Sequence, residues 1–155
     1  MNEIDTYDRA ILRELQRDSR QSSEQLAGVV ALSATAVQRR IKRLRETGII
    51  RAEQAVLAPE ALGRKLSMVI QVTLTRGRGD IVADFKAQMR GMPEVQQCYY
   101  VTGEHDFVLI VTAEDMADYE RLTHRLFFNN PNIQKFHTAV VMEPVKVGLQ
   151  VPIPD

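Results

Sequence analysis

The sequence predicts an α+β protein in which three short helices precede a unit of four strands and two helices. Two observations support this fold class. The first fifty residues repeat apolar side chains at helical spacing, whereas later segments alternate apolar and polar side chains as strands do. The 155 residues allow one domain or two small ones. With 45% hydrophobic and 26% charged residues, the composition excludes a disordered or collagen-like chain.

The first fifty residues carry the start and stop signals of three helices. Asp5 is a candidate N-cap of the first helix, and Ser22 opens a capping box before the second. Ser33 is a candidate N-cap for a third helix over about residues 34–47, and Gly48 follows where a left-handed C-cap is typical. The apolar positions expected to face inward are Tyr7, Ile11, Leu12 and Leu15, then Leu26, Ala27 and Val30, then Val37, Ile41 and Leu44.

Cations concentrate on the third predicted helix. Residues 33–51 contain six Lys or Arg against the single acid Glu46, whereas residues 52–155 hold ten against thirteen acids. The whole chain is formally neutral, so a uniformly basic nucleic-acid coat is excluded. At about 100° per residue, small, polar and cationic side chains face away from the apolar stripe or flank it. They are Thr35, Ala36, Gln38, Arg39, Lys42 and Arg43.

A helix pair with a tight connection, small polar residues at the start of its second helix and a cationic outer face indicates a helix-turn-helix. Gln and Arg side chains can contact base edges in the major groove, while other cations contact phosphates. The alternative is an ordinary three-helix bundle with a charged surface. The residues predicted to bind double-stranded DNA are Ser33, Thr35, Ala36, Gln38, Arg39, Lys42 and Arg43.

Beyond the helices, residues 51–65 are expected to form a connector in which Arg51–Leu57 makes a linking strand. Asp80 and Asp115 are the predicted N-caps of two further helices. Arg76–Gly79 is predicted to form a turn. Four strands are expected, over residues 66–75, 95–102, 106–112 and 133–142. The order βαββαβ, with right-handed crossovers, predicts a ferredoxin-like sandwich with both helices on one face of an antiparallel sheet.

The uncovered sheet face is expected to be half apolar and therefore to meet a partner. It would carry Val69, Gln71 and Thr73 or their neighbours, together with Cys98, Tyr100 and Thr102. We expect a homodimer or a larger assembly, which would also let two helix-turn-helix units bind two half-sites.

Four segments carry a resemblance to a known family. They are Asp8–Arg20 (DRAILRELQRDSR), Leu32–Ile50 (LSATAVQRRIKRLRETGII), Val95–Leu109 (VQQCYYVTGEHDFVL) and Val140–Lys146 (VVMEPVK). Nearly end to end, the chain resembles the leucine-responsive/AsnC, or feast/famine, family of bacterial and archaeal transcriptional regulators. The resemblance implies a helix-turn-helix domain over residues 1–50, a connector over 51–65, and an effector-binding and oligomerisation domain over 66–155. It also implies dimers that often form octamers, with an amino acid or related metabolite bound between subunits.

The resemblance places the effector in the loop between the second and third strands and beside the last strand. Backbone N–H groups near Gly103 can receive a carboxylate, and Glu104 or Asp106 can balance an α-ammonium group. The residues alone favour a plain hairpin turn, and it is the resemblance that favours a ligand loop. The implied effector-binding residues are Tyr100, Val101, Thr102, Gly103, Glu104, His105, Asp106, Val140 and Val141.

Other chemistry is sparse in the sequence. The three histidines are widely separated and no phosphate-binding or dinucleotide fingerprint occurs, so no metal, cofactor or catalytic residue is expected. The single cysteine, the lack of a signal peptide and the short apolar runs predict a cytoplasmic protein without a membrane partner. The alternative function is a small metabolite-binding protein or enzyme on a ferredoxin-like fold, with the helical bundle used for docking.

Overall fold

The structure, a computed structural model, describes residues 4–75 and 79–154. The chain divides into two compact units. The helical unit comprises Met1–Val56 and Lys146–Asp155, and the sheet unit comprises Leu57–Val145. The division differs from the predicted domain limits in two places: residues 146–154 group with the helices, and the predicted connector over residues 51–65 is divided after Val56. Of the predicted turn at Arg76–Gly79, residues 76–78 lie outside the described residues, and Gly79 begins a helix.

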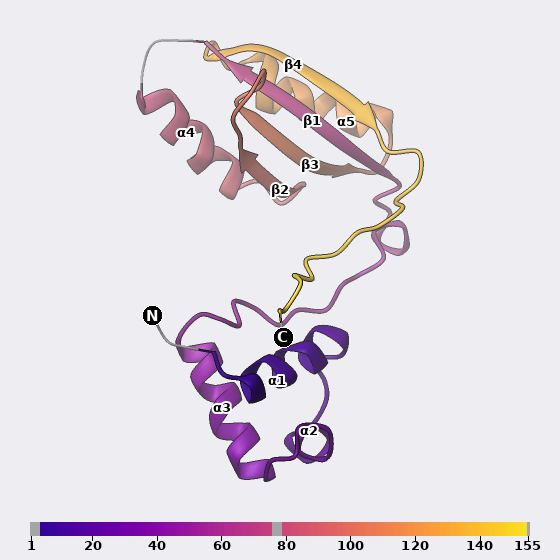
Figure 1. Cartoon of the computed structure of the whole chain (residues 1–155). Helices are drawn as coiled ribbons and strands as arrows, with labels where there is room; N and C mark the ends of the chain where they lie inside the picture. The colour runs from indigo at the N-terminus through magenta and orange to yellow at the C-terminus, as the bar shows by residue number, and fades with distance from the viewer. Residues whose placement is uncertain (1–3, 76–78, 155) are drawn as a thin grey trace. The chain divides into compact units, whose positions relative to one another are not determined.

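Three helices make up most of the helical unit: α1 (Thr6–Arg17), α2 (Ser23–Val30) and α3 (Ala34–Glu46) (Figure 1). Their predicted N-caps are confirmed, because the side chains of Asp5, Ser22 and Ser33 each accept a hydrogen bond from a first-turn backbone N–H. Gly48 takes the left-handed conformation after α3, with φ +73°. The N–H of Ile50 then reaches the carbonyl of Leu44 at 2.9 Å.

The core of the helical unit is small. Its buried apolar side chains, within the described residues, are Ile11, Leu26, Val30, Val37, Ile41 and Leu44. All six were predicted from helical spacing. Tyr7 was also expected inside but is exposed, because it lies in the first turn of α1 beside the Arg40 guanidinium.

The predicted linking strand is wrong for this structure. Residues 51–57 are exposed and form neither a strand nor a backbone hydrogen bond to any described residue. A strand needs a neighbour to satisfy its N–H and C=O groups, and this segment has none here. A short 3₁₀ helix, Pro59–Leu62, follows, and Gly63 ends it in the left-handed conformation.

The sheet unit has the predicted βαββαβ order. Its strands are β1 (Leu66–Leu74), β2 (Val95–Tyr100), β3 (Phe107–Ala113) and β4 (Ile133–Val140). All neighbours are antiparallel in the order β2-β3-β1-β4, which is the ferredoxin-like arrangement. The helices are α4 (Gly79–Arg90) and α5 (Met116–Thr123), and α5 continues into a π-helical turn, His124–Phe128.

The two predicted caps of these helices have different outcomes. Asp115 caps α5 by accepting a 2.7 Å hydrogen bond from the N–H of Asp118. Asp80 does not cap α4, because the helix already begins at Gly79 and Asp80 lies in its first turn.

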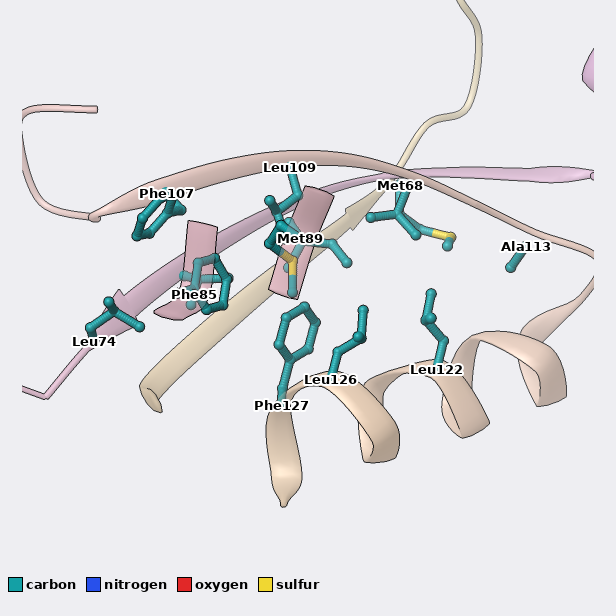
Figure 2. Close-up of a cluster of buried hydrophobic side chains, with 13 residues drawn as sticks. Met68, Leu74, Phe85, Met89, Phe107, Leu109, Ala113, Leu122, Leu126 and Phe127 are labelled. Carbon is teal, nitrogen blue, oxygen red and sulfur yellow. The ribbon is translucent and has the colours of Figure 1, made fainter. Parts of the chain in front are cut away.

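Helices α4 and α5 pack on the same face of the sheet, where the larger core lies (Figure 2). From Met68 onward, every second residue of β1 is buried there, as the alternation predicted: Met68, Ile70, Val72 and Leu74. From the helical side come Phe85, Met89, Leu122, Leu126 and Phe127. This core fixes the register of the strands that hold the candidate ligand loop.

The predicted composition of the open sheet face is wrong for β2. Cys98 pairs with Leu109, and Tyr100 pairs with Phe107, so both lie on the helix-covered side. The ring of Tyr100 contacts Phe107, and the Lys86 ammonium of α4 lies 4.3 Å from its centroid. A register shift between Val95 and Gln97 reverses the alternation expected from the sequence.

Candidate functional site

The outer surface of α3 has the composition that the sequence predicted. Ser33, Thr35, Gln38, Arg39 and Lys42 are exposed, and Ala36 is half-buried. The opposite side of the helix is buried against α1 and α2 through its apolar stripe. The N-terminal half of α3 therefore presents short side chains, an amide and a cation to the solvent. This composition suits close approach to a DNA groove.

Arg43 is held differently from the prediction. Its guanidinium forms an ion pair with the carboxylate of Asp8 on α1, and Asp8 is completely buried. Arg40 binds the other oxygen of the same carboxylate at 2.9 Å and also binds Asp5 at 2.7 Å. Both arginines thus connect α3 to α1. The spacing of residues along the sequence gave no sign of these acidic partners.

Most of the other cations near α3 are paired as well. Arg45 binds Glu53 at 2.9 Å, and Lys42 lies 3.8 Å from Glu46. Within the described part of the chain, Arg39 and Arg51 are the only cations of residues 33–51 without an ion pair. Exposed pairs such as Lys42 with Glu46 are weak, so a phosphate can displace the acid.

The ion pairs between α3 and the N-terminal end of α1 shift the pKa values of the groups that form them. The pKa of the Asp5 carboxyl lies below its ordinary value, first because it accepts the backbone N–H of Asp8 and also because Arg40 binds it. Hydrogen bonds to Asp5 and Asp8 raise the pKa of the Arg40 guanidinium. The charged forms of these groups are therefore favoured in the folded helical unit.

The predicted ligand loop connects β2 to β3. Gly103 has φ +126°, a conformation that other residues rarely adopt. The N–H groups of residues 102–105 donate no backbone hydrogen bond to any described residue. They are therefore free to receive a carboxylate. The exposed carboxylate of Glu104 lies 3.4 Å from the Lys135 ammonium.

Asp106 has a structural task that sequence reasoning missed. Its carboxylate accepts a 2.7 Å hydrogen bond from the N–H of Leu74, and its own N–H donates to the carbonyl of Val72 at 2.9 Å. Asp106 thus anchors the loop to the end of β1. His105, which the resemblance placed among the effector-binding residues, has its Nδ1 3.2 Å from the Thr73 hydroxyl, and its ring centroid lies 5.7 Å from that of His137.

The structure does not bring Val140 and Val141 to this loop within one chain. Val140 pairs with Met68, and the N–H of Val141 donates to Ser67, at the beginning of β1. The loop is anchored at Leu74, the other end of the same strand. At about 3.3 Å per residue, the two regions lie roughly 20 Å apart. The expectation that they lie side by side is wrong for a single chain.

The C-terminal segment contacts α1, which the sequence did not indicate. The Gln16 amide donates to the carbonyl of Val151 at 3.0 Å and accepts its N–H at 2.8 Å. Gln150 donates to the backbone carbonyl of Gln16 at 2.7 Å, and Arg13 donates to that of Pro154 at 2.8 Å. Main-chain recognition of this kind leaves little signal in side-chain patterns.

The described residues contain no group of three His, Cys, Asp or Glu side chains arranged to hold a metal ion. Nor is any helix among them both long and apolar enough to span a bilayer.

A capped three-helix unit with an exposed recognition helix, joined to a ferredoxin-like sheet unit, defines a helix-turn-helix regulator with a ligand-binding module. Family models agree with both halves: a winged helix-turn-helix DNA-binding model matches residues 4–51, and the Lrp/AsnC ligand binding domain matches residues 67–151. The chain belongs to the Lrp/AsnC family and is a DNA-binding transcriptional regulator. This family consists of transcriptional regulators rather than enzymes.

Individual relatives show the same likeness. An HTH-type transcriptional regulator, y4tD of Sinorhizobium fredii, is 49% identical over 97% of this chain and 89% of its own length. The leucine-responsive regulatory protein of Haemophilus influenzae is 37% identical over 92% of this chain and 86% of its own. A Neisseria meningitidis transcriptional regulator, solved in complex with L-methionine, superposes with a TM-score of 0.91 at 31% identity, covering 97% of each chain.

Proposed function

We propose that this regulator reads operator DNA through the exposed surface of α3. The contacting residues in this proposal are Ser33, Thr35, Ala36, Gln38, Arg39 and Lys42. The observation that carries it is Arg39, which pairs with no acid in the described part of the chain and lies in the N-terminal half of α3 among short polar side chains. Gln38 and Arg39 can contact base edges, while Lys42 can exchange Glu46 for a phosphate.

Fluorescence anisotropy with promoter duplexes tests the DNA surface. Replacing Arg39 by Ala should weaken operator binding by about 1–3 kcal/mol, roughly 5- to 150-fold. Arg90→Ala is the matched control, because Arg90 is an exposed arginine in the last turn of α4. An Arg39→Ala variant that binds operator DNA as tightly as the control would refute the assignment.

The effector in this proposal is an amino acid bound at the loop of residues 100–106. The free N–H groups around Gly103 would receive its carboxylate, and Glu104 would balance its ammonium group, in exchange for Lys135. L-Methionine is the first candidate, because the related Neisseria regulator was solved with it. Asp106 is left to hold the loop, since its carboxylate is already bound to β1.

Isothermal titration calorimetry with L-methionine and a panel of other amino acids tests the loop. Glu104→Gln should weaken binding at least several-fold, because it removes the counter-charge of the α-ammonium group. Glu143→Gln serves as a control for an exposed acid outside the loop. If no amino acid releases heat or shifts the melting temperature, the loop is a plain turn.

Assembly follows from the same geometry. Val140 and Val141 can join a site at the loop only if another copy of the chain supplies them, so we propose an effector site between subunits of a homodimer or octamer. Such a regulator would act in the cytoplasm, where it meets DNA. Multi-angle light scattering should report a mass of at least two chains. A monomer at micromolar concentration would contradict the shared site.

A further inference from the structure

Asp8 is a completely buried carboxylate at the contact between α1 and α3. One oxygen binds Arg40 at 2.9 Å, and the other forms an ion pair with Arg43. The same side chain accepts the backbone N–H of Asp5 at 3.2 Å, while Asp5 accepts the N–H of Asp8 at 2.8 Å. A capping motif of α1 and two cations of α3 therefore meet at one carboxylate.

The cluster of Asp5, Asp8, Arg40 and Arg43 is electrically balanced. Two carboxylates face two guanidinium groups, and the Arg40 guanidinium also lies over the ring of Tyr7, 5.4 Å from its centroid. A buried carboxylate without such partners is strongly disfavoured. Arg40 retains 22% of its side-chain exposure and Arg43 retains 44%, so their exposed edges lie on the surface of α3.

This arrangement changes which cations are available to DNA. Binding to phosphates is driven by the release of counterions from them, and a cation that is already neutralised by a buried acid adds little. Arg40 and Arg43 carry two of the charges that make α3 basic, yet both are matched by acids of α1. Arg39 lies on the same helix without an acidic partner in the described structure.

We propose that Asp8 is a positioning residue that holds α3 against α1 and withholds Arg40 and Arg43 from the phosphate backbone. Sequence-independent binding is thereby kept low, and recognition depends on Arg39, Gln38 and the short side chains at the start of α3. The inference rests on the proposed DNA surface of α3. It extends that surface by dividing the arginines of one helix between folding and DNA contact.

The salt dependence of DNA binding distinguishes the two classes of arginine. Arg39→Gln and Arg43→Gln remove the same charge from positions one turn apart on α3. A random-sequence duplex lacks the matched base edges, so the Arg39 guanidinium is expected to bind a phosphate there. The slope of log K against log salt should therefore become shallower by about one per bound copy for Arg39→Gln. For Arg43→Gln it should stay unchanged. An equally shallower slope in both variants would overturn the role of Asp8, whereas no change for Arg39→Gln would overturn the DNA surface instead.

Asp8→Asn should strengthen binding to random-sequence DNA, whereas a variant that merely disturbs the fold should weaken it. The amide keeps the shape and the capping contact but releases Arg43, while Arg40 keeps Asp5 as its partner. The slope should therefore steepen by about one per bound copy, and random-sequence affinity should rise several-fold. A folded Asp8→Asn protein with an unchanged or shallower slope would refute the proposal. Circular dichroism checks the helices, and if the variant does not fold, the Arg43→Gln comparison decides the question.

Discussion

Each of the two units of the chain is stabilised by a different kind of interior. In the described residues, the sheet unit has thirteen buried apolar side chains in one core, whereas the helical unit has six. The helical unit adds the buried Asp8 cluster and the hydrogen bonds from the C-terminal segment to α1. The small helical unit thus uses Arg40 and Arg43 to stabilise its own fold. In the proposed mode of binding, the other cations of α3 contact DNA.

The largest effect is expected at the ion cluster. Asp8→Ala should destabilise the helical unit by about 3–5 kcal/mol, because it leaves Arg43 without its acid, leaves Arg40 with Asp5 alone and removes the acceptor of the Asp5 N–H. Hydrogen exchange should become fast throughout α1 and α3 while β1 and β3 stay protected. Loss of protection in both units together would show that they do not unfold separately.

A comparable effect is expected in the other unit from an apolar truncation. Leu109→Ala should cost the sheet unit about 2–5 kcal/mol, because Leu109 is fully buried between β1 and the helices. Its neighbour Ile110 lies half-buried on the open face, so Ile110→Ala is a matched control with a smaller loss. Chemical denaturation of both variants measures the difference. Equal losses would contradict the assignment of the two sheet faces.

A smaller effect is expected where the C-terminal segment contacts α1. Gln16→Ala removes two side-chain hydrogen bonds to the backbone of Val151, each worth about 1 kcal/mol. The helical unit should melt earlier, and residues 149–152 should exchange faster. Arg17→Ala, which removes an exposed pair with Glu14, should change little. Equal melting temperatures for the two variants would show that the segment adds no stability.

The smallest effect is expected in how the stability of the helical unit depends on acidic pH. The pKa of the Asp5 carboxyl is lower in the folded state than its ordinary value of 3.8. The ionised carboxylate therefore stabilises the fold at pH values above 3.8. That contribution is lost as the pH falls through the lower folded value. Asp5→Asn should therefore lose less stability than the wild type on acidification below about pH 4. Thermal melts between neutral pH and this range provide the measurement, and parallel losses would contradict the Asp5 contribution.

Local signals predicted much of the fold. The caps at Asp5, Ser22, Ser33 and Asp115 and the alternation in β1 depend on neighbouring residues, so the sequence contains them. Less of the candidate site could be predicted from the sequence, because its interactions join residues that are far apart in the chain. The pairing of Arg43 with Asp8 joins residues 35 apart, and the anchoring of Asp106 on Leu74 spans 32.

Two errors have a different origin. The irregular register of β2 shifts the side of Cys98 and Tyr100, and a single displaced residue leaves no mark in the pattern of a short strand. The linking strand was expected over Arg51–Leu57, yet a side-chain pattern says nothing about whether a strand has a pairing neighbour.

Selection of genomic fragments by the purified full chain tests the central claim that α3 reads specific DNA. The account predicts that a few fragments are strongly enriched, that they carry paired half-sites separated by about one helical turn or its multiples, and that Gln38→Ala with Arg39→Ala abolishes the enrichment. If no fragment is retained above the input at low ionic strength, or if the double variant selects the same fragments, α3 is not the reading surface.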